Sequence, residues 1–337
     1  MSRDRAEGSV SVLVFAVLAF LAAGAGGVVL LLNASIQYQR KSQAAYQARL
    51  SLEGHAESVV AALAADPTPR SDSPLDPVWD FVASAPDGVR LTLSDVSSAL
   101  NPNWIQKSVF SKTALRSTLK TEGDADVLQQ RRENTGFSES LGEAYGDLFV
   151  EGALGRYFTA YGYANINVTD EFALQRLYAL RTDDSAGAEV FHSQVQRLLM
   201  EQRILKPAEL RTFLGSVYDA MYPVVNVEPC MNVHFVDPDV LIALLSYPEL
   251  KVPHPAEAAR QILDARGRTE LSEDDLTRIM GAPPASRIYQ YFGVVTWFWR
   301  ISASAGSSRL DLVVARLPGA TGDPTRYATV EERLGAP

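Results

Sequence analysis

The sequence VSVLVFAVLAFLAAGAGGVVLLL, residues 10–32, decides the fold class of this chain. Ser11 is its only polar side chain. At a rise of about 1.5 Å per residue, a helix of this length spans the apolar core of a bilayer, which is about 30 Å thick. No other stretch of the chain is comparably apolar. We therefore expect one membrane-spanning segment or a secretory signal, and not a protein with several spans.

Three interpretations of the N-terminus compete. A cleaved signal peptide would end after residues 23–25, but the apolar run continues to Leu32, where a mature soluble protein should be polar. A plain signal anchor is the second interpretation. The third is a prepilin-type leader, which is short and polar, ends in glycine and runs directly into the apolar helix. Residues 1–8 fit this pattern, with Gly8 as the last leader residue and Ser9 as the first mature residue.

The charges beside the apolar run and the prepilin-type leader predict opposite orientations of the body across the membrane. Arg40, Lys41 and Arg49 follow the run, whereas the arginines of the leader are offset by acidic residues. The positive-inside rule would then favour a cytoplasmic body. The leader interpretation predicts a body on the outer side of the inner membrane, and we adopt it here.

The residues after the span predict a continuation of the same helix. Residues 33–65 contain no proline and one glycine, Gly54, and they are rich in good helix formers. Asp66-Pro67 then breaks the pattern. The prediction is one helix from about residue 9 to 65, roughly 85 Å long. A helix half in lipid and half under a globular head is typical of pilins, and it also suits a generic anchored protein with a stalk.

Composition excludes some classes of function. The chain has 337 residues, a formal net charge of −9 and 47 % apolar residues, so it can bury a sizeable core but lacks the basic balance of a nucleic-acid binder. Its one cysteine, Cys230, cannot form an internal disulfide. The apolar neighbours of Cys230 favour a packing role over a catalytic thiol.

The remaining chain predicts an α+β body with a helical insertion. Residues 67–77 have the composition of a loop, and residues 89–96 alternate as a half-buried strand does. From about residue 105 to 280 the pattern is helical, and further strands are predicted at 289–303 and 310–317. Flanking strands need one another to form a sheet, so the helical block is interpreted as an insertion. The expected order is a leader (1–8), a transmembrane helix (9–33), a helix extension with the first strand or strands of a pilin-like α+β domain (34–104), an inserted, mainly helical domain (105–284), C-terminal strands (285–317) and a flexible tail (318–337).

Two segments of the helical block align without gaps, residues 165–177 and residues 232–244. Each starts with Asn, contains an Asp five residues later and continues into an apolar helix-like stretch. An Asn or Asp ahead of such a stretch caps the free N–H groups of the helix, and its leucines pack inward. Asn232, Asp237 and Leu241 therefore need no catalytic role, and Asn165 and Asn167 belong to the same structural motif.

The second of these segments is similar to the "NVNTAPxEVLxAL" stretch of the general secretion pathway protein K family, the minor pseudopilins of type II secretion systems. His234 and Phe235 stand where that pattern has Asn-Thr. Residues 91–103 resemble the family's strand ending in "(I/F)NxN", and residues 259–266 and 271–280 resemble its following helices. Each of these motifs is weak by itself, but they follow one another in the order of the family. The resemblance covers most of the chain.

The resemblance implies a function as well as a fold. It implies a non-enzymatic subunit that caps the pseudopilus tip, helps to start its assembly for export of folded proteins, and works with minor pseudopilins I and J and other pseudopilins. It also implies processing by the prepilin peptidase, methylation of the new N-terminus, and an inner-membrane protein with a periplasmic body. The fifth mature residue is Leu13 and not the glutamate of ordinary pilins. That absence is similar to the K subunit, although Leu13 could equally be only a lipid-facing side chain.

No constellation for catalysis is present. The sequence contains no H-E-x-x-H, no G-x-S-x-G, no Walker loop and no dinucleotide fingerprint. No cofactor is predicted with certainty. The resemblance raises calcium as a ligand, and the candidate oxygen donors are scattered: Asp311, Asp323, Glu273, Asp274 and Asp275.

Two other functions remain as alternatives. One is a membrane-anchored helix-hairpin-helix protein that binds DNA in a competence-like system, which residues 214–217 and 279–281 mildly resemble. Such hairpins have nearby Lys and Arg, whereas residues 273–275 are acidic, so no nucleic-acid partner is expected. The other is an exported enzyme on a helical tether, for which no site is found.

Overall fold

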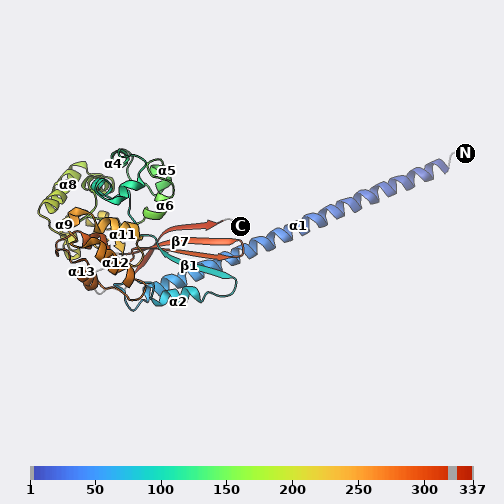
Figure 1. Cartoon of the computed structure of the whole chain (residues 1–337). Helices are drawn as coiled ribbons and strands as arrows, with labels where there is room; N and C mark the ends of the chain where they lie inside the picture. The colour runs from blue at the N-terminus through green and yellow to red at the C-terminus, as the bar shows by residue number, and fades with distance from the viewer. Residues whose placement is uncertain (1–3, 318–324, 336–337) are drawn as a thin grey trace.

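The computed structural model describes residues 4–317 and 325–335, and it shows an α+β fold with a long N-terminal helix, as the sequence predicts. Helix α1 (Asp4–Ala64) is continuous and projects far beyond the rest of the molecule (Figure 1). Its last turns pack on a β-sheet through Leu52, Ala56, Val59 and Leu63, which recur at helical spacing and are buried. The apolar residues from Leu13 to Leu32 are exposed. Among the described residues, α1 is the one helix long and apolar enough to cross a membrane.

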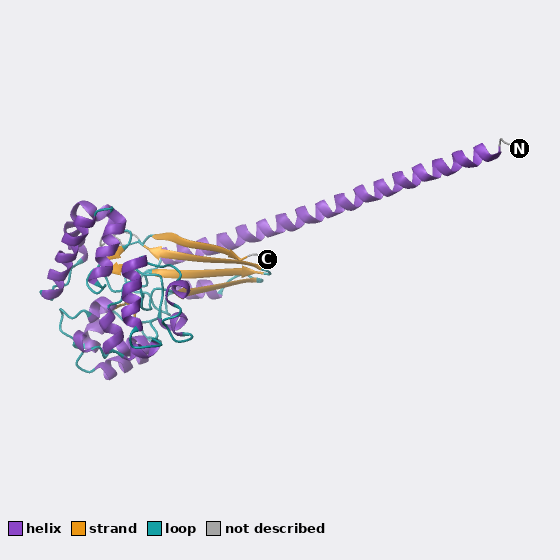
Figure 2. Cartoon of the chain, turned by 90° about the horizontal axis from the view of Figure 1, so that it is seen from above, coloured by secondary structure: helices purple, strands orange, loops and turns teal. Residues whose placement is uncertain are grey.

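A four-stranded antiparallel sheet lies along the end of α1. Its strands are β1 (Val89–Asp95), β6 (Phe298–Ala305), β7 (Ser308–Arg316) and β8 (Tyr327–Gly335), in the order β1-β6-β7-β8. Register places Leu93 opposite Ile301, and Ile301 opposite Leu312. These apolar residues share a face, which packs against α1 and the short helix α2 (Pro77–Ala83). The strands run from the helical body back along α1 (Figure 2).

Two local expectations are wrong. The tail was expected to be flexible, but residues 327–335 form β8, because the outer edge of β7 offers backbone partners and Tyr327 packs into the sheet core. The strand expected at 289–303 begins only at Phe298. Its first residues form helix α14 (Ile288–Tyr291), where the Ser286 hydroxyl accepts a hydrogen bond from the N–H of Ile288. Aromatic residues favour strands on average, so composition alone predicted a longer strand.

The helical body lies at the end of the sheet remote from the free part of α1 (Figure 1). Its α-helices are α3 (Lys107–Lys112), α4 (Asp124–Thr135), α5 (Leu141–Tyr145), α6 (Ala153–Tyr157), α7 (Glu171–Thr182), α8 (Ser185–Met200), α9 (Pro207–Leu214), α10 (Tyr218–Met221), α11 (Pro238–Leu245), α12 (Pro255–Ala265), α13 (Glu273–Met280) and α14. Its 3₁₀ helices are η1 (Ala114–Thr118), η2 (Gly215–Val217) and η3 (Pro248–Leu250). Two pairs of very short parallel strands complete it, β2 (Ala164–Asn165) with β3 (Val225–Asn226), and β4 (Met231–Asn232) with β5 (Phe292–Gly293).

These strand pairs divide most of the body into two modules. The first module, residues 164–226, contains α7 to α10 and packs around its own apolar core. The second module, residues 231–293, contains α11 to α14 and shares a larger core with α3 to α6. Each module is enclosed by one of the short parallel pairs. The second module is followed directly by the turn into β6, so it stands next to the sheet.

Candidate functional site

The first module begins with a compact asparagine turn. The side-chain Oδ1 of Asn165 accepts a hydrogen bond from the N–H of Asn167 at 2.8 Å, and its backbone carbonyl accepts one from Thr169 at 2.8 Å. The chain then enters α7, where the carboxylate of Asp170 accepts hydrogen bonds from the N–H groups of Phe172 and Ala173. Asp170 is therefore the N-cap that the sequence pattern predicts.

The second module begins with the same turn. Asn232 Oδ1 accepts from the N–H of His234 at 2.9 Å, its carbonyl accepts from Val236 at 3.0 Å, and Asp237 caps α11 by accepting from Asp239 at 2.8 Å. The N–H groups of Ile166 and Val233, one in each module, donate at 3.0 Å to the carbonyls of Asn226 and Gly293.

The modules are thus related by one constant offset. Asn165 and Asn232 differ by 67 residues, and so do their strand partners Asn226 and Gly293. The gapless alignment seen in the sequence corresponds to a structural repeat that extends to the closing strand of each module.

The asparagines do not cap the helices themselves. Asp170 and Asp237 do so, and Leu241 packs inward with no exposed surface, as expected. Asn165 instead donates through Nδ2 to the carbonyl of Glu228 at 2.6 Å. Asn232 donates through Nδ2 to the carbonyls of Asp72 and Val294 and to the hydroxyl of Thr296, at 2.7, 3.0 and 3.1 Å.

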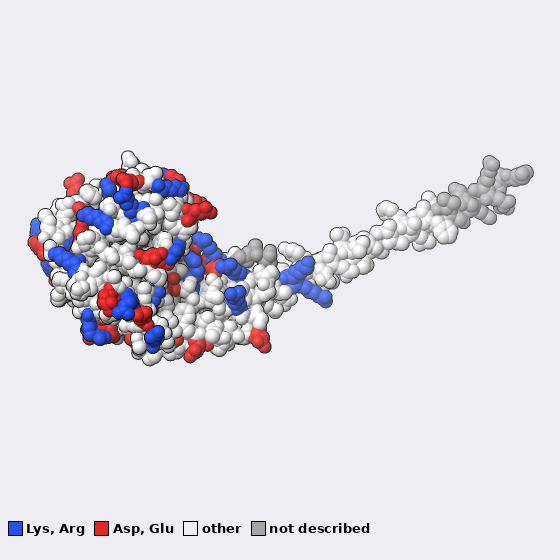
Figure 3. All heavy atoms as spheres, in the orientation of Figure 1, with Lys and Arg blue, Asp and Glu red and all other residues white. Residues whose placement is uncertain are grey.

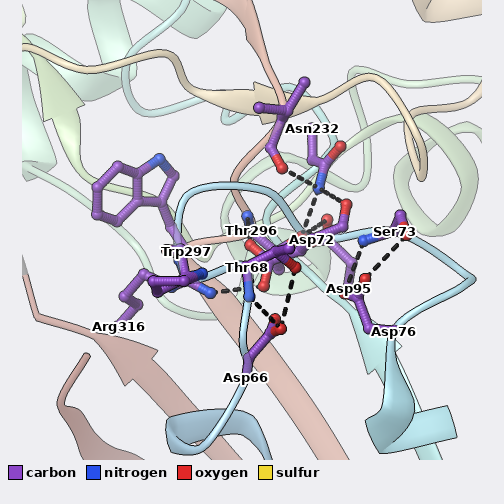
Figure 4. Close-up of polar contacts among 12 residues, drawn as sticks. Asp66, Thr68, Asp72, Ser73, Asp76, Asp95, Asn232, Thr296, Trp297 and Arg316 are labelled. Carbon is purple, nitrogen blue, oxygen red and sulfur yellow. Dashed lines mark hydrogen bonds and ion pairs between the residues drawn. The ribbon is translucent and has the colours of Figure 1, made fainter. Parts of the chain in front are cut away.

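Asp72 is the centre of a buried polar junction between the second module and the sheet (Figure 4). One carboxylate oxygen pairs with Arg316 Nη2 at 2.5 Å, and the other accepts from the N–H of Thr296 at 2.7 Å. Arg316 also donates to the carbonyl of Pro69 at 2.7 Å and to the hydroxyl of Tyr327 at 3.0 Å. The loop after α1, the end of β7 and the start of β8 therefore meet at this ion pair.

A second carboxylate extends the junction toward β1. Asp95 accepts from the backbone N–H groups of Ser97 and Ser98 at 2.6 and 2.9 Å and from the hydroxyl of Thr296 at 2.9 Å. Asn232 donates its own N–H to the Ser98 hydroxyl at 2.8 Å. A continuous chain of hydrogen bonds thus runs from β1 through Thr296 and Asn232 to Asp72 and Arg316, and it joins residues that lie far apart in the sequence.

Burial dominates the electrostatics here. Burial raises the pKa of Asp72 to about 7, against the lowering effect of the Arg316 guanidinium. Burial also raises the pKa of Asp95, although several hydrogen bonds to its ionised form oppose the shift. Because Arg316 and Thr296, which donate to Asp72, come from other segments, and Thr296 also donates to Asp95, the junction acts as a structural joint.

Asp66, Asp72 and Asp76 form the one group of possible metal ligands among the described residues, with one oxygen of each within 4.8 Å of the others. A calcium ion needs six to eight oxygens. Here Arg316 and Thr296 donate to both oxygens of Asp72, Ser73 donates to both oxygens of Asp76, and the Arg316 guanidinium is already the counter-charge of Asp72. The group as described does not fit a bound cation.

The calcium ligands suggested by the sequence do not belong to this group. Asp311 on β7 accepts from Ser302 and Arg309, and Asp275 forms a capping box with Ser272 at the start of α13 beside Glu273 and Asp274. Asp323 lies outside the described residues.

Cys230 is the one thiol of the chain. Burial raises the pKa of the Cys230 thiol to about 12, so the thiol is protonated at neutral pH and is a poor nucleophile. Cys230 lines a cavity of about 50 Å³ between the modules and the sheet, together with Trp104, Tyr163, Asn226 and Trp297. No charged side chain lines it, and it is far smaller than the several hundred Å³ typical of a small-molecule site.

The processing residues lie near the start of α1. Gly8 and Ser9 fall within the helix, but their side chains are outside the described part, so cleavage between them stays a prediction. Leu13 is exposed on the apolar part of the helix.

Sequence reasoning missed the junction itself. Asp72 was assigned to a loop, and Asp95 and Arg316 were taken as ends of strands. The available signal was a charged residue directly after an apolar run, since Arg316 follows the buried residues 312–315 of β7. No pattern in the sequence could show that Arg316 turns inward onto Asp72.

No protein-family model and no curated protein matches the sequence. A chain in the crystal structure of the GspK–GspI–GspJ complex from the type 2 secretion system of enterotoxigenic Escherichia coli is similar to this one. The two are 12 % identical, the match covers 89 % of this chain and 99 % of that chain, and the TM-score is 0.42.

Proposed function

We propose that this chain is a minor pseudopilin of a type II secretion system, and that it caps the tip of the pseudopilus and helps to start its assembly. The observation that carries the proposal is the division of α1. Its C-terminal turns pack against an antiparallel sheet, while the stretch from Leu13 to Leu32 is exposed and apolar. This is the arrangement of a pilin subunit, in which one helix serves the bilayer, the filament and the head. The motifs of the K family, found in order along the sequence, support the same assignment.

The shape of the head supports a position at the tip. The helical body lies beyond the sheet, on the side away from the free part of α1, and is much broader than the sheet (Figures 1 and 2). In a filament whose subunits stack along their N-terminal helices, a body in this place would obstruct a subunit above. The proposed role is structural, and its partners are the minor pseudopilins I and J and other pseudopilins.

Leu13 agrees with a terminal position. In ordinary pilins a glutamate at the fifth mature residue is thought to neutralise the N-terminal amine of the subunit ahead. A subunit with nothing ahead has no amine to neutralise, and an unpaired carboxylate in lipid would be costly. An apolar Leu13 carries no such cost.

N-terminal mass spectrometry tests the proposal. In cells that contain the prepilin peptidase, we expect the chain to begin at N-methylated Ser9. Gly8→Val should block cleavage, whereas Gly27→Val, a matched change on an open face of the same helix, should leave it intact. An intact Gly8–Ser9 bond in the unmodified chain would contradict the assignment. Protease digestion of spheroplasts should degrade the body, because we place it in the periplasm.

Capping requires a second test, since cleavage alone does not show position. The full chain should co-purify with minor pseudopilins I and J, and secretion should fail without it. If subunits stack above the helical body when filaments are imaged with the body labelled, the tip assignment is wrong even though the protein is a pseudopilin.

A further inference from the structure

The part of α1 between the apolar span and the sheet carries only positive charge. Residues 33–52 contain Arg40, Lys41 and Arg49 and no acidic residue, in a chain whose net charge is −9. Figure 3 shows the part of the projecting helix that is not drawn in grey as white, except for blue basic side chains close to where it joins the sheet. In the whole chain acidic residues outnumber basic residues, 40 to 31, so this stretch differs in the sign of its charge from the chain as a whole.

Arg40 and Lys41 differ from Arg49 in how they are used. Arg49 donates to Glu53 at 2.5 Å and lies 3.6 Å from Glu332 on β8, so its charge is satisfied within the protein. Arg40 and Lys41 are exposed and form no ion pair within the described part of the chain. Two neighbouring cations on the projecting part of α1 therefore have no ion-pair partner among the described residues.

Helix geometry places these two cations at the edge of a membrane that contains the span. Arg40 lies eight residues after Leu32, about 12 Å along the helix axis. The headgroup layer adds about 5–8 Å to each side of the apolar core. Helical side chains lean toward the N-terminus, which here is the direction of the bilayer, and long basic side chains extend back to the interface. Tyr38, which is 75 % exposed and lies two residues nearer the span than Arg40, suits the same interface.

We propose that Tyr38, Arg40 and Lys41 form a basic collar that binds the phosphate headgroups of anionic phospholipids and fixes how far α1 rises from the membrane. A guanidinium recognises phosphate through paired N–H donors, and each basic residue at an anionic surface contributes about 1 kcal/mol, or about fivefold in lipid preference. The proposal rests on the proposed function only in requiring that residues 10–32 cross the bilayer. It holds whichever side the body occupies, because both leaflets can present anionic lipid.

The test measures lipid selectivity of the full chain in bilayers. The protein is reconstituted in phosphatidylcholine with traces of spin-labelled phosphatidylglycerol or spin-labelled phosphatidylcholine, and the motionally restricted fraction of each label is compared. We expect a severalfold preference for phosphatidylglycerol that high salt removes. Arg40→Gln/Lys41→Gln should abolish it. Arg176→Gln/Arg197→Gln, which removes two exposed body charges without described ion pairs, should not.

Each outcome decides the proposal. Loss of preference in the collar variant alone supports it. An unchanged preference in that variant, or no preference in the unmodified chain, overturns it. If the collar variant instead loses binding to partner subunits while lipid preference was never present, the cations serve an acidic protein surface. The lipid measurements use neither the peptidase nor partner proteins, so a failed tip assignment would not affect them, and alkaline extraction confirms separately that the span is inserted.

Discussion

The two modules of the helical body use the same asparagine turn, but they join it to different surroundings. In the first module the side-chain amide of Asn165 reaches the carbonyl of Glu228, in the connection between the modules. In the second, the amide of Asn232 reaches across to the loop at Asp72 and to Thr296 next to the sheet. The turn of the first module thus holds the two modules together, since Asn167 also donates to the side chain of Gln290, whereas the turn of the second module fastens that module to the sheet.

A second difference lies two residues further on. The Asn167 amide accepts from the N–H of Leu205 and donates to its carbonyl, at 2.8 and 3.0 Å. His234 occupies the equivalent position, and its ring accepts from the N–H of Leu271 and lies 3.2 Å from the carbonyl of Arg266. Both side chains supply one acceptor and one donor to the loop after a helix. The histidine that departs from the family pattern therefore performs the same task, with a group that can be protonated.

The comparison teaches that the repeat conserves geometry while its polar partners decide the role of each module. The largest expected effects concern the attachment that only the second module has. The changes below are measured by urea unfolding of the full chain in detergent, followed by tryptophan fluorescence.

Asp72→Ala should have the largest effect, a loss of about 4 kcal/mol in the free energy of unfolding. The change leaves the Arg316 guanidinium buried without its counter-charge, and breaking a buried pair from one side costs about 3–5 kcal/mol. Asp66→Ala, which removes only the bonds to Thr68, is the matched control and should cost less than about 1 kcal/mol. Equal losses in the two variants would show that the junction is not the joint between module and sheet.

Asn232→Ala and Asn165→Ala compare the two turns directly. We expect losses of about 3 and about 2 kcal/mol, because the three bonds of the Asn232 amide are 2.7–3.1 Å long, whereas two of the three bonds of the Asn165 amide are 3.3 and 3.4 Å long and therefore weaker. Hydrogen exchange should separate them further. Asn232→Ala should also expose amides of β6 near Thr296, whereas Asn165→Ala should act within the body only. If both variants disturb the sheet equally, the distinction between the modules is wrong.

Gly293→Ala and Asn226→Ala change equivalent positions in the closing strands of the two modules. They should differ in how much they lower the free energy of unfolding. A Cβ at Gly293 would lie 2.7 Å from Cβ of Pro229, inside a rigid ring, so we expect a loss of about 2 kcal/mol from overpacking. Asn226 carries a buried Oδ1 that has no hydrogen-bond partner among the described residues, and its removal offsets the lost packing. Asn226→Ala should therefore change the stability by less than about 1 kcal/mol. A larger loss would mean that this oxygen has a bound partner, such as water.

The sequence was most informative where one pattern fixes one structure. The apolar run and the absence of helix breakers predicted α1, alternation predicted β1, and the two aligned segments predicted the caps at Asp170 and Asp237. Each of these depends on neighbours in the chain, so it can be inferred from spacing.

The sequence was least informative where distant segments supply the partners. β8 depends on the free edge of β7, and the Asp72–Arg316 pair joins residues that are 244 positions apart. Similarly, the use of His234 as a substitute for an amide depends on where the loop at Leu271 returns. A polar tail or a lone histidine has no local signal for such contacts.

The smallest expected effect is the pH dependence of the His234 contact. Since the Leu271 N–H donates to Nε2, the proton of the neutral ring lies on Nδ1 and faces the carbonyl of Arg266. If Nε2 were protonated, its N–H would face the N–H of Leu271, and neither donor would have an acceptor. Burial lowers the pKa of His234 and outweighs the hydrogen bonds to the backbone of Arg266 and Leu271 and the charge of Glu270, which raise it; the charge of the Arg266 guanidinium adds a smaller lowering effect. The folded chain therefore binds fewer protons than the unfolded chain below an unfolded pKa of about 6.5.

Stability from His234 should thus be complete above about pH 6.5 and decrease as the pH falls, by at most about 1.4 kcal/mol per pH unit. His234→Asn restores the residue type of the first module and should remove this slope, at a modest cost in packing at neutral pH. The measurement is the difference in unfolding free energy between the unmodified chain and this variant at about pH 7.5 and about pH 5.5, since the carboxylates titrate alike in both. A difference that does not shrink toward low pH would show that the ring is not held neutral, and the two modules would then be equivalent in their response to acid.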